Sequence, residues 1–357
     1  MLRPMIENMQ NSVYSQQMRG PTGSSAYSIE ASSVTQSLVS QPIVPADIES
    51  EPLVSIDNKT VDVLGNKIIS LKTTEKDDRG ILLDMLALSK EEQLIIKGIM
   101  LVVTSPGKSG DDTTTFCSEE SCKILSEVMQ KHPPAQMSSL FLMRLLVLEE
   151  SLVFNPVRPC AVAMVDSMIT RLVAGQGSAN GFASVPSTVM ALCTLANILS
   201  HKSGIALIFD RDRVAGLVVD IALVGLAHAR VEVRQMSATV AYNFTLAFED
   251  ASSAGTRSLS QLSTVSPGRL ILSVGQEIEL NPLAVQLFCG VMESVLAEKD
   301  ACVRHRRLCV ALKLVRIGGQ AARALGKDLG LYNDLNALTP MSEAERLVIE
   351  EMKRNFV

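Results

Sequence analysis

Apolar residues recur at helical spacing in this chain from near Val61 to the C-terminus. No stretch alternates apolar and polar residues for long enough to indicate a sheet. Only 4% of the 357 residues are aromatic and none is Trp, so the core volume must come from Leu, Ile, Val, Ala and the 16 Met. Such a composition suits many close-packed helices better than a β-sandwich. The sequence therefore predicts an all-α fold.

Helix-start signals help to place the individual elements. Ser89 precedes two glutamates, Ser342 is followed by Glu343 and Glu345, and Asn281 stands directly before a proline. Residues 270–280 fit either a short strand or an extra turn. The expected helices cover residues 59–71, 79–88, 90–104, 118–131, 135–150, 159–174, 186–201, 204–209, 213–228, 231–248, 281–298, 300–316, 319–328, 331–337 and 342–355.

The polar segments divide the chain. Residues 1–53 are rich in Ser, Gln, Pro and Gly, which predicts a disordered N-terminal tail. Residues 54–357 then form one helical domain, interrupted by a glycine-rich loop at 175–185 and a flexible insertion at 250–269. The glycines of these interruptions follow no expected strand, so neither segment indicates a phosphate-binding loop.

A repeat emerges when the most apolar helices are aligned. The segment ALCTLANILSH (191–201) resembles SATVAYNFTLAF (237–248), and their asparagines, Asn197 and Asn243, lie 46 residues apart. The segment RRLCVALKLVRIGG (306–319) places Lys313 at the equivalent step, and FLMRLLVLEESL (141–152) fits the same slot. A period of about 40–47 residues is typical of armadillo and HEAT arrays, in which neighbouring repeats must stack. The repeat predicts an armadillo-like superhelix, an α-solenoid.

Charge and cysteine usage limit the partners and the compartment. A net charge of -5 and a pI near 5.5 argue against nucleic acid. The seven Cys include no C-x-x-C pair, and the N-terminus has no apolar core like a signal peptide, so we expect reduced thiols in the cytoplasm and also the nucleus. The longest apolar stretch, 214–229, contains Asp220 and falls short of the ~20 residues that span a bilayer. We expect it to be a buried helix and expect no membrane partner.

The residues give little support for catalysis. His201 and His305 have no companion at metal-ligand spacing and His132 precedes two prolines, so we expect neither a metal nor a cofactor. Cys302 and His305 are three residues apart and could touch, but no third residue orients them. Cys302 and Cys309 share an apolar face that indicates core packing. No G-x-S-x-G motif occurs. The chain is therefore expected not to be an enzyme.

Five segments carry a family pattern. They are VMESVLAEKDACVRHRRLCVALKLVRIGGQAARALGKDLG (291–330), MRLLVLEE (143–150), LCTLANILSHKSGIALI (192–208), ATVAYNFTLAF (238–248) and LSKEEQLIIKGIMLVVTS (88–105). Together they resemble the PUL domain, the armadillo-like C-terminal domain of the phospholipase-activating protein of ubiquitin turnover. The first of these segments is the strongest match, because it resembles the final Arg-Leu-x-Val-Ala-Leu helix of that family.

The resemblance implies a partner. PUL domains bind the acidic C-terminal tail of the hexameric AAA+ segregase, valosin-containing protein, in a positively charged concave groove. The positions that match the arginines of that groove are Arg144 and Arg307. The resemblance thus implies an adaptor in ubiquitin-dependent protein turnover and ubiquitin homeostasis, with other ubiquitin-pathway proteins as further partners.

The residue types agree with such a groove. An asparagine amide can both donate to and accept from an extended backbone, as Asn197 and Asn243 would. Arginine meets a carboxylate with two parallel hydrogen bonds, and Lys313 and Arg234 could add charge. Each residue also has a structural interpretation. Arg144 could pair with a buried carboxylate, Arg307 could belong partly to a solvated cluster with Arg304 and Arg306, and the asparagines could bond neighbouring helices.

Two rival hypotheses remain open. One is a generic armadillo-type scaffold for an unrelated protein partner. The other is a scaffold related to redox or deubiquitylating modules, which predicts a thiol-dependent activity that a Cys302→Ser variant would lose.

Overall fold

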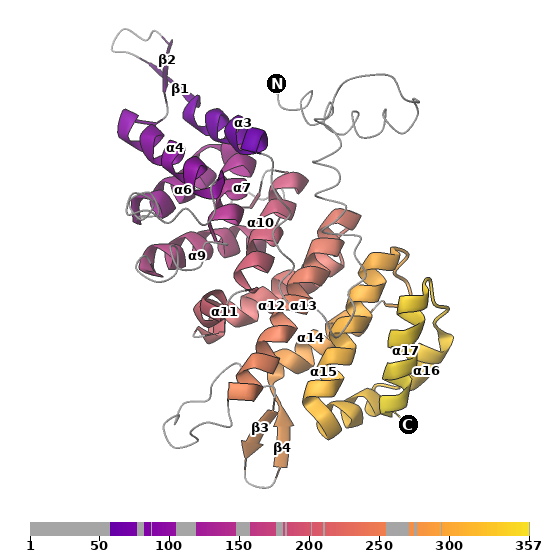
Figure 1. The fold of residues 1–357 in the computed structure, drawn as a ribbon. Coiled ribbons are helices and arrows are strands. Elements are labelled where there is room, and N and C mark those ends of the chain that lie inside the picture. The colour runs from indigo at the N-terminus through magenta and orange to yellow at the C-terminus, as the bar shows by residue number, and fades with distance from the viewer. Residues whose placement is uncertain are drawn as a thin grey trace, which may run out of the picture.

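The computed structural model describes a helical protein (Figure 1). The described residues are 58–76, 82–86, 88–104, 119–147, 158–175, 181–182, 184–200, 202–209, 211–254, 271–274, 277–293 and 295–356. The α-helices are α3 (Asn58–Ile69), α4 (Lys90–Thr104), α6 (Glu119–Lys131), α7 (Gln136–Leu146), α9 (Arg158–Ala174), α10 (Val185–Ile198), α11 (Lys202–Phe209), α12 (Asp212–Leu226), α13 (Val231–Ala254), α14 (Pro282–Met292), α15 (Ala301–Asp328), α16 (Leu331–Ala337) and α17 (Glu343–Phe356), with a 3-10 turn at Pro133–Ala135.

Most of the helices pack in two rows. In the central row, α3, α7, α10, α13, α15 and α17 each contact the next helix in that order. In the flanking row, α4, α6, α9, α12 and α14 do the same, and each covers a helix of the central row. Figure 1 shows the chain passing along these rows from one end of the molecule to the other. The all-helical prediction is confirmed at this level, and the packing is compatible with an α-solenoid.

Two short antiparallel hairpins interrupt the helices. Strand β1 (Lys72–Lys76) pairs with β2 (Leu82–Leu86), so the helix expected at 79–88 is wrong. The sequence between these strands contains Asp77, Asp78 and Gly80, which are turn-forming residue types that the helical pattern obscured. Strand β3 (Ile271–Val274) pairs with β4 (Glu277–Leu280), which decides the ambiguous segment 270–280 in favour of strands.

The expected capping residues form the predicted helix starts. The Ser89 hydroxyl accepts from the Glu92 N–H, and the Glu92 carboxylate accepts from the Ser89 N–H, which is a complete capping box. Asn281 accepts from the Leu283 N–H with Pro282 at the first helical position. These side chains satisfy backbone N–H groups that lack a partner within the helix.

Several expected boundaries are corrected. Helix α14 ends at Met292, short of residue 298, because Glu293 adopts an extended backbone. Helix α13 continues to Ala254, so the first five residues of the expected insertion at 250–269 are helical. Helix α15 joins the two helices expected at 300–316 and 319–328, but Gly319 breaks its path with a φ of 56°, a conformation that favours glycine. The expected tail at 1–53 and residues 255–269 lie outside the described residues.

Residues 214–226 of the expected stretch 214–229 belong to α12, which packs against α9, α11, α13 and α14, and residues 227–229 follow its end. Its Ala215, Val218, Val219 and Ala222 are buried, while Val224 is exposed. Among the helices of the described residues, none has the length and apolarity needed to cross a bilayer.

A buried ion pair attaches the last helix to the central row. The guanidinium of Arg304 on α15 donates from Nε and Nη2 to the two carboxylate oxygens of Glu345 on α17, at 2.5 and 2.9 Å. Arg304 also donates to the Thr339 carbonyl, and Glu345 accepts from the Met341 N–H. Both side chains are almost entirely buried. A buried pair of this kind depends on both members, because either charge alone would be buried without compensation.

Glu345→Gln is therefore expected to lower the free energy of unfolding by about 3–5 kcal/mol, because it leaves the Arg304 charge buried and unpaired. Urea denaturation followed by circular dichroism measures this loss. Arg346→Gln is the matched control, since Arg346 pairs with Glu343 and Glu350 on the exposed face of the same helix. Equal stability of the Glu345→Gln variant and the wild type would contradict the prediction.

Candidate functional site

Side-chain hydrogen bonds connect successive helices of the central row. Asn197 on α10 donates from Nδ2 to the Arg144 carbonyl on α7 at 3.1 Å. Asn243 on α13 donates in the same way to the Ala196 carbonyl on α10 at 2.9 Å. The structural interpretation of both asparagines, a bond to a neighbouring helix, is thus observed. Each side-chain carbonyl oxygen remains available to accept from another group, because the bond uses only an N–H.

Arg144 lies next to these asparagines on the central row. Its side chain is half-buried, and its Nε has no hydrogen-bond partner. Burial raises the pKa of the neighbouring Cys193 thiol, and the positive charge of Arg144 opposes that shift, which places the guanidinium near Cys193 of α10. Among the described residues, no carboxylate forms an ion pair with Arg144, so the expected alternative of a buried acidic partner is not observed.

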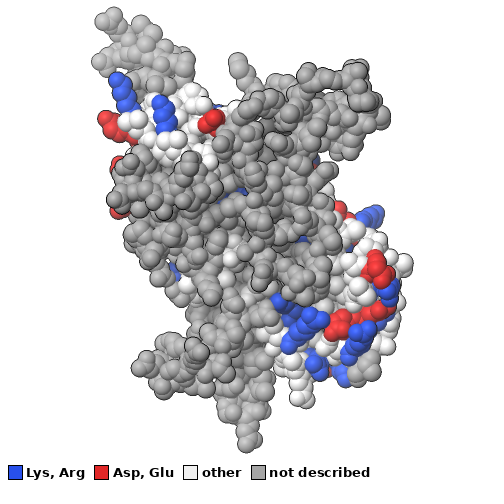
Figure 2. Space-filling model, in the orientation of Figure 1, with Lys and Arg blue, Asp and Glu red and all other residues white. Residues whose placement is uncertain are grey.

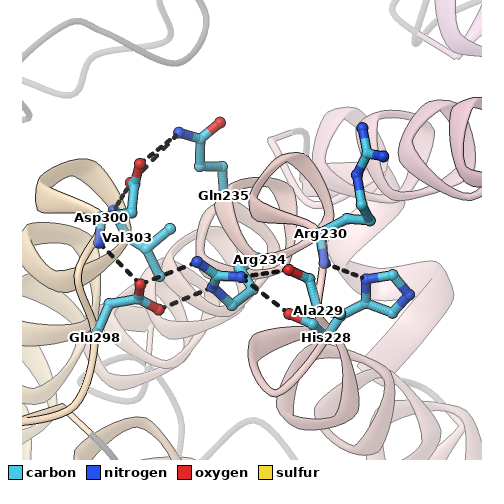
Figure 3. Close-up of polar contacts among 8 residues, drawn as sticks. All are labelled: His228, Ala229, Arg230, Arg234, Gln235, Glu298, Asp300 and Val303. Carbon is cyan, nitrogen blue, oxygen red and sulfur yellow. Dashed lines mark hydrogen bonds and ion pairs between the residues drawn. The ribbon is translucent and has the colours of Figure 1, made fainter.

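Arg234 is held within the protein. Its guanidinium donates from Nε and Nη2 to both carboxylate oxygens of Glu298, at 3.0 and 3.2 Å (Figure 3). Its Nη1 donates to the His228 and Ala229 carbonyls in the turn before α13. Burial alone would raise the pKa of Glu298, but the Asp300 N–H and the Arg234 charge lower it below its ordinary value. Arg234 therefore joins α13 to the turn before α15, and these bonds use four of its five N–H donors.

Arg307 lies beside the same carboxylate. Only 4% of Arg307 is exposed, and its Nε has no hydrogen-bond partner among the residues that the structure describes. Burial lowers the pKa of the guanidinium, the negative charge of Glu298 opposes that shift, and the positive charge of Arg234 adds to it. Glu298 thus faces two arginines but makes hydrogen bonds to one, which leaves Arg307 with an unfilled capacity to bind an anion.

The expectation of a solvated arginine cluster on α15 is wrong. Arg304 is buried against Glu345, and Arg306 donates from Nη1 to the Gln235 carbonyl and the Thr239 hydroxyl of α13. Lys313 is half-buried on α15, six positions after Arg307. Arg304, Arg306 and Arg307 therefore interact with α17, with α13 and with Glu298, respectively.

The predicted site residues fall into two groups on the central row. The amide group consists of Arg144, Asn197 and Asn243, which adjoin one another through the hydrogen bonds between α7, α10 and α13. The arginine group consists of Arg234, Arg307 and Glu298 at the N-terminal ends of α13 and α15. Arg306 relates the two groups, because it contacts Gln235 and Thr239, one to two turns before Asn243 on α13.

Two residues of this site were missed in the sequence. Glu298 stands in a polar turn, and only its contact with Arg234 across 64 positions identifies it. Asp300 caps α15 by accepting from the Val303 N–H and also accepts from Gln235 of α13. The cap had a recognisable signal, an aspartate directly before an apolar helical pattern, whereas the contact with Gln235 had none.

The thiol chemistry of α15 centres on a buried residue. The Cys309 sulfur lies 3.5 Å from His305 Nε2, but burial raises the pKa of Cys309 to about 12. The thiolate is the nucleophilic form, so Cys309 is not activated at neutral pH. Cys302 is half-buried one turn before His305. Within the described part of the chain, no three His, Cys, Asp or Glu side chains gather as a metal site.

Comparisons with known proteins do not assign a family: no family model matches the sequence, and no curated protein matches it.

The pKa of Cys309 predicts a pH-dependent stability. A free thiol titrates near pH 8.5, so above that pH the unfolded chain releases a proton that the folded protein retains. The contribution of Cys309 is complete below about pH 8.5 and is lost as the pH rises toward 12. Between pH 8 and pH 10, the wild type should lose about 2 kcal/mol of unfolding free energy relative to Cys309→Ala. Urea titrations at several pH values measure the difference, and parallel curves for the two proteins would contradict it.

Proposed function

We propose that this chain is a non-catalytic armadillo-like adaptor that holds the acidic C-terminal tail of a AAA+ segregase in ubiquitin-dependent protein turnover. The two rows of helices support the scaffold part of this proposal, because stacked helices create a long surface on which an extended segment can lie. The PUL-like segments of the sequence supply the identity of the tail. A generic scaffold for an unrelated protein is the second candidate, and the same packing supports it.

The observation that carries the proposal is that two arginines each have a buried donor that is not hydrogen-bonded. Arg144 and Arg307, the positions that match the family's groove arginines, both have a buried Nε without a hydrogen-bond partner. A buried donor of a charged group that remains unsatisfied costs about 1–3 kcal/mol or more. A carboxylate delivered by a partner would remove that cost, and arginine is the side chain best shaped to receive it.

The spacing of the helices fits an extended tail. Arg144 lies on α7 and Arg307 on α15, with α10 and α13 between them in the central row. Three steps between packed helices amount to about 24–30 Å. An extended peptide covers about 3.3 Å per residue, so eight or nine residues bridge the two arginines. Asn197 and Asn243 lie between them and would accept backbone N–H groups through their side-chain oxygens.

The other expected site residues have different roles in this proposal. Arg234 acts as a positioning residue, because its bonds to Glu298 and to two carbonyls hold the turn beside Arg307. The negative charge of Glu298 attracts both Arg234 and Arg307 and offsets their mutual repulsion. Because only 4% of Arg307 is exposed, the proposal requires this end of α15 to open for an incoming carboxylate. Lys313 adds positive charge on α15.

A binding experiment tests the proposal. A fluorescein-labelled peptide of the segregase's acidic C-terminal tail, at least ten residues long, should bind the full chain in an anisotropy titration. Combining Arg144→Met with Arg307→Met should weaken binding at least tenfold, since methionine retains the apolar stem and removes the guanidinium. The control combines Lys123→Met with Arg213→Met, which removes the same charge from exposed positions on α6 and α12.

The outcomes separate the candidates. If the tail does not bind the wild type, the segregase assignment is wrong and the generic scaffold is favoured. If the tail binds but the Arg144 and Arg307 variants bind equally well, the residue assignment is wrong. If a scrambled tail of the same composition binds as tightly, charge alone governs recognition and the specific tail is not the ligand.

A further inference from the structure

Helix α15 concentrates positive charge in an acidic protein. Its 28 residues include seven Lys or Arg and a single acidic residue, whereas the whole chain carries a net charge of -5. The basic residues are Arg304, Arg306, Arg307, Lys313, Arg316, Arg323 and Lys327. The first three are buried and meet groups of the protein itself. The last three are exposed, so internal packing does not account for them.

Two glycines gather the exposed cations at one end of the molecule. Gly319 breaks α15 and redirects its last turns. Gly326 then lies against the ring of Phe356 at the end of α17, so closely that a Cβ at this position would be 2.2 Å from a ring carbon. This contact brings the segment with Arg323 and Lys327 to the turn of α17 that carries Lys353 and Arg354. Figure 2 shows Lys and Arg side chains gathered over this end, with acidic side chains among them.

The local carboxylates do not balance these cations. Glu351 pairs with both Arg316 and Arg354, at 3.3 and 3.0 Å. Neither Arg323 nor Lys327 forms an ion pair within the described part of the chain. The helix dipole stabilises a single cation in the last turn of a helix, but it does not explain a cluster of this size.

Exposed apolar residues adjoin the cluster. Leu329 closes α15 and is 45% exposed, and Tyr332 opens α16 and is 40% exposed. Cations beside an exposed leucine and tyrosine complement a segment that carries both carboxylates and apolar side chains. A polyanion such as RNA would gain from the cations but carries no aliphatic side chains to cover Leu329, and Asp328 and Glu351 would repel it as they would an acidic peptide.

We propose that the C-terminal basic surface, made by Arg316, Arg323, Lys327, Lys353 and Arg354 with Leu329 and Tyr332, is a second docking site for an acidic, partly apolar protein segment. It shares no residue with the amide group or the arginine group, so it goes beyond the function proposed above. A partner could therefore contact the protein at two separate places, with a tail on the central row and an acidic segment on this end.

The test uses the full chain and a fluorescein-labelled peptide of twelve residues with six glutamates, two leucines and one tyrosine. Anisotropy titrations should show binding that weakens with added salt and at least tenfold for a variant combining Arg323→Glu and Lys327→Glu. Both positions are exposed, and circular dichroism verifies that the variant is folded. The matched control combines Lys97→Glu and Lys123→Glu, which makes the same charge change on α4 and α6 and should change the affinity less than twofold.

Three results would overturn the inference: unchanged binding by the Arg323 and Lys327 variant, an equal loss in the matched control, or tighter binding of a twelve-nucleotide polyuridine that depends on the same two residues. The Arg144 and Arg307 variants distinguish this site from the tail-binding site proposed on the central row. Loss of peptide binding in those variants, with none in the Arg323 and Lys327 variant, would leave the adaptor proposal standing and remove this one.

Discussion

No helix of the central row can bury its apolar side alone. The inner helices α7, α10, α13 and α15 are each covered by the helices before and after them and by the flanking row, whereas α3 packs on α7 and α4 and α17 packs on α15 and α16. Every other feature of the molecule depends on this stacking. The asparagine and arginine side chains that cross from one helix to the next fix the spacing and register of neighbours that apolar contact alone would leave free to slide. The candidate site is thus built from the same residues that keep the rows aligned.

The sequence predicted the helices well where local chemistry determines them. Ser89, Asn281 and Ser342 start helices through their own side chains, and most expected boundaries agree with the structure within a few residues. The hairpin at 72–86 was missed because its second strand is as apolar as a helix, and periodicity in such a short run does not distinguish the two. The two helices expected at 300–316 and 319–328 left a gap at residues 317–318, although the chain continues there as one helix that is broken at Gly319.

The site was only partly predictable. Asn197 and Asn243 were found from their repeating positions and Arg144 from the family resemblance, and hydrogen bonds between helices make them neighbours. Whether an arginine on α15 faces solvent or the interior depends on residues far away in the sequence, as Glu298 and Glu345 show. Arg304, Arg306 and Arg307 looked alike in the sequence. In the structure Arg304 pairs with Glu345 of α17, and Arg306 donates to α13. Arg307 lies beside Glu298, whose carboxylate already pairs with Arg234.

The break at Gly319 has a consequence for how the protein ends. Nine further residues of straight helix would project about 14 Å past the last layer and leave an apolar edge open to a neighbouring molecule. Because the chain folds back and Gly326 admits the ring of Phe356, the final layer is closed by its own residues. The fold-back of α15 therefore packs α16 and α17 against the rest of the central row.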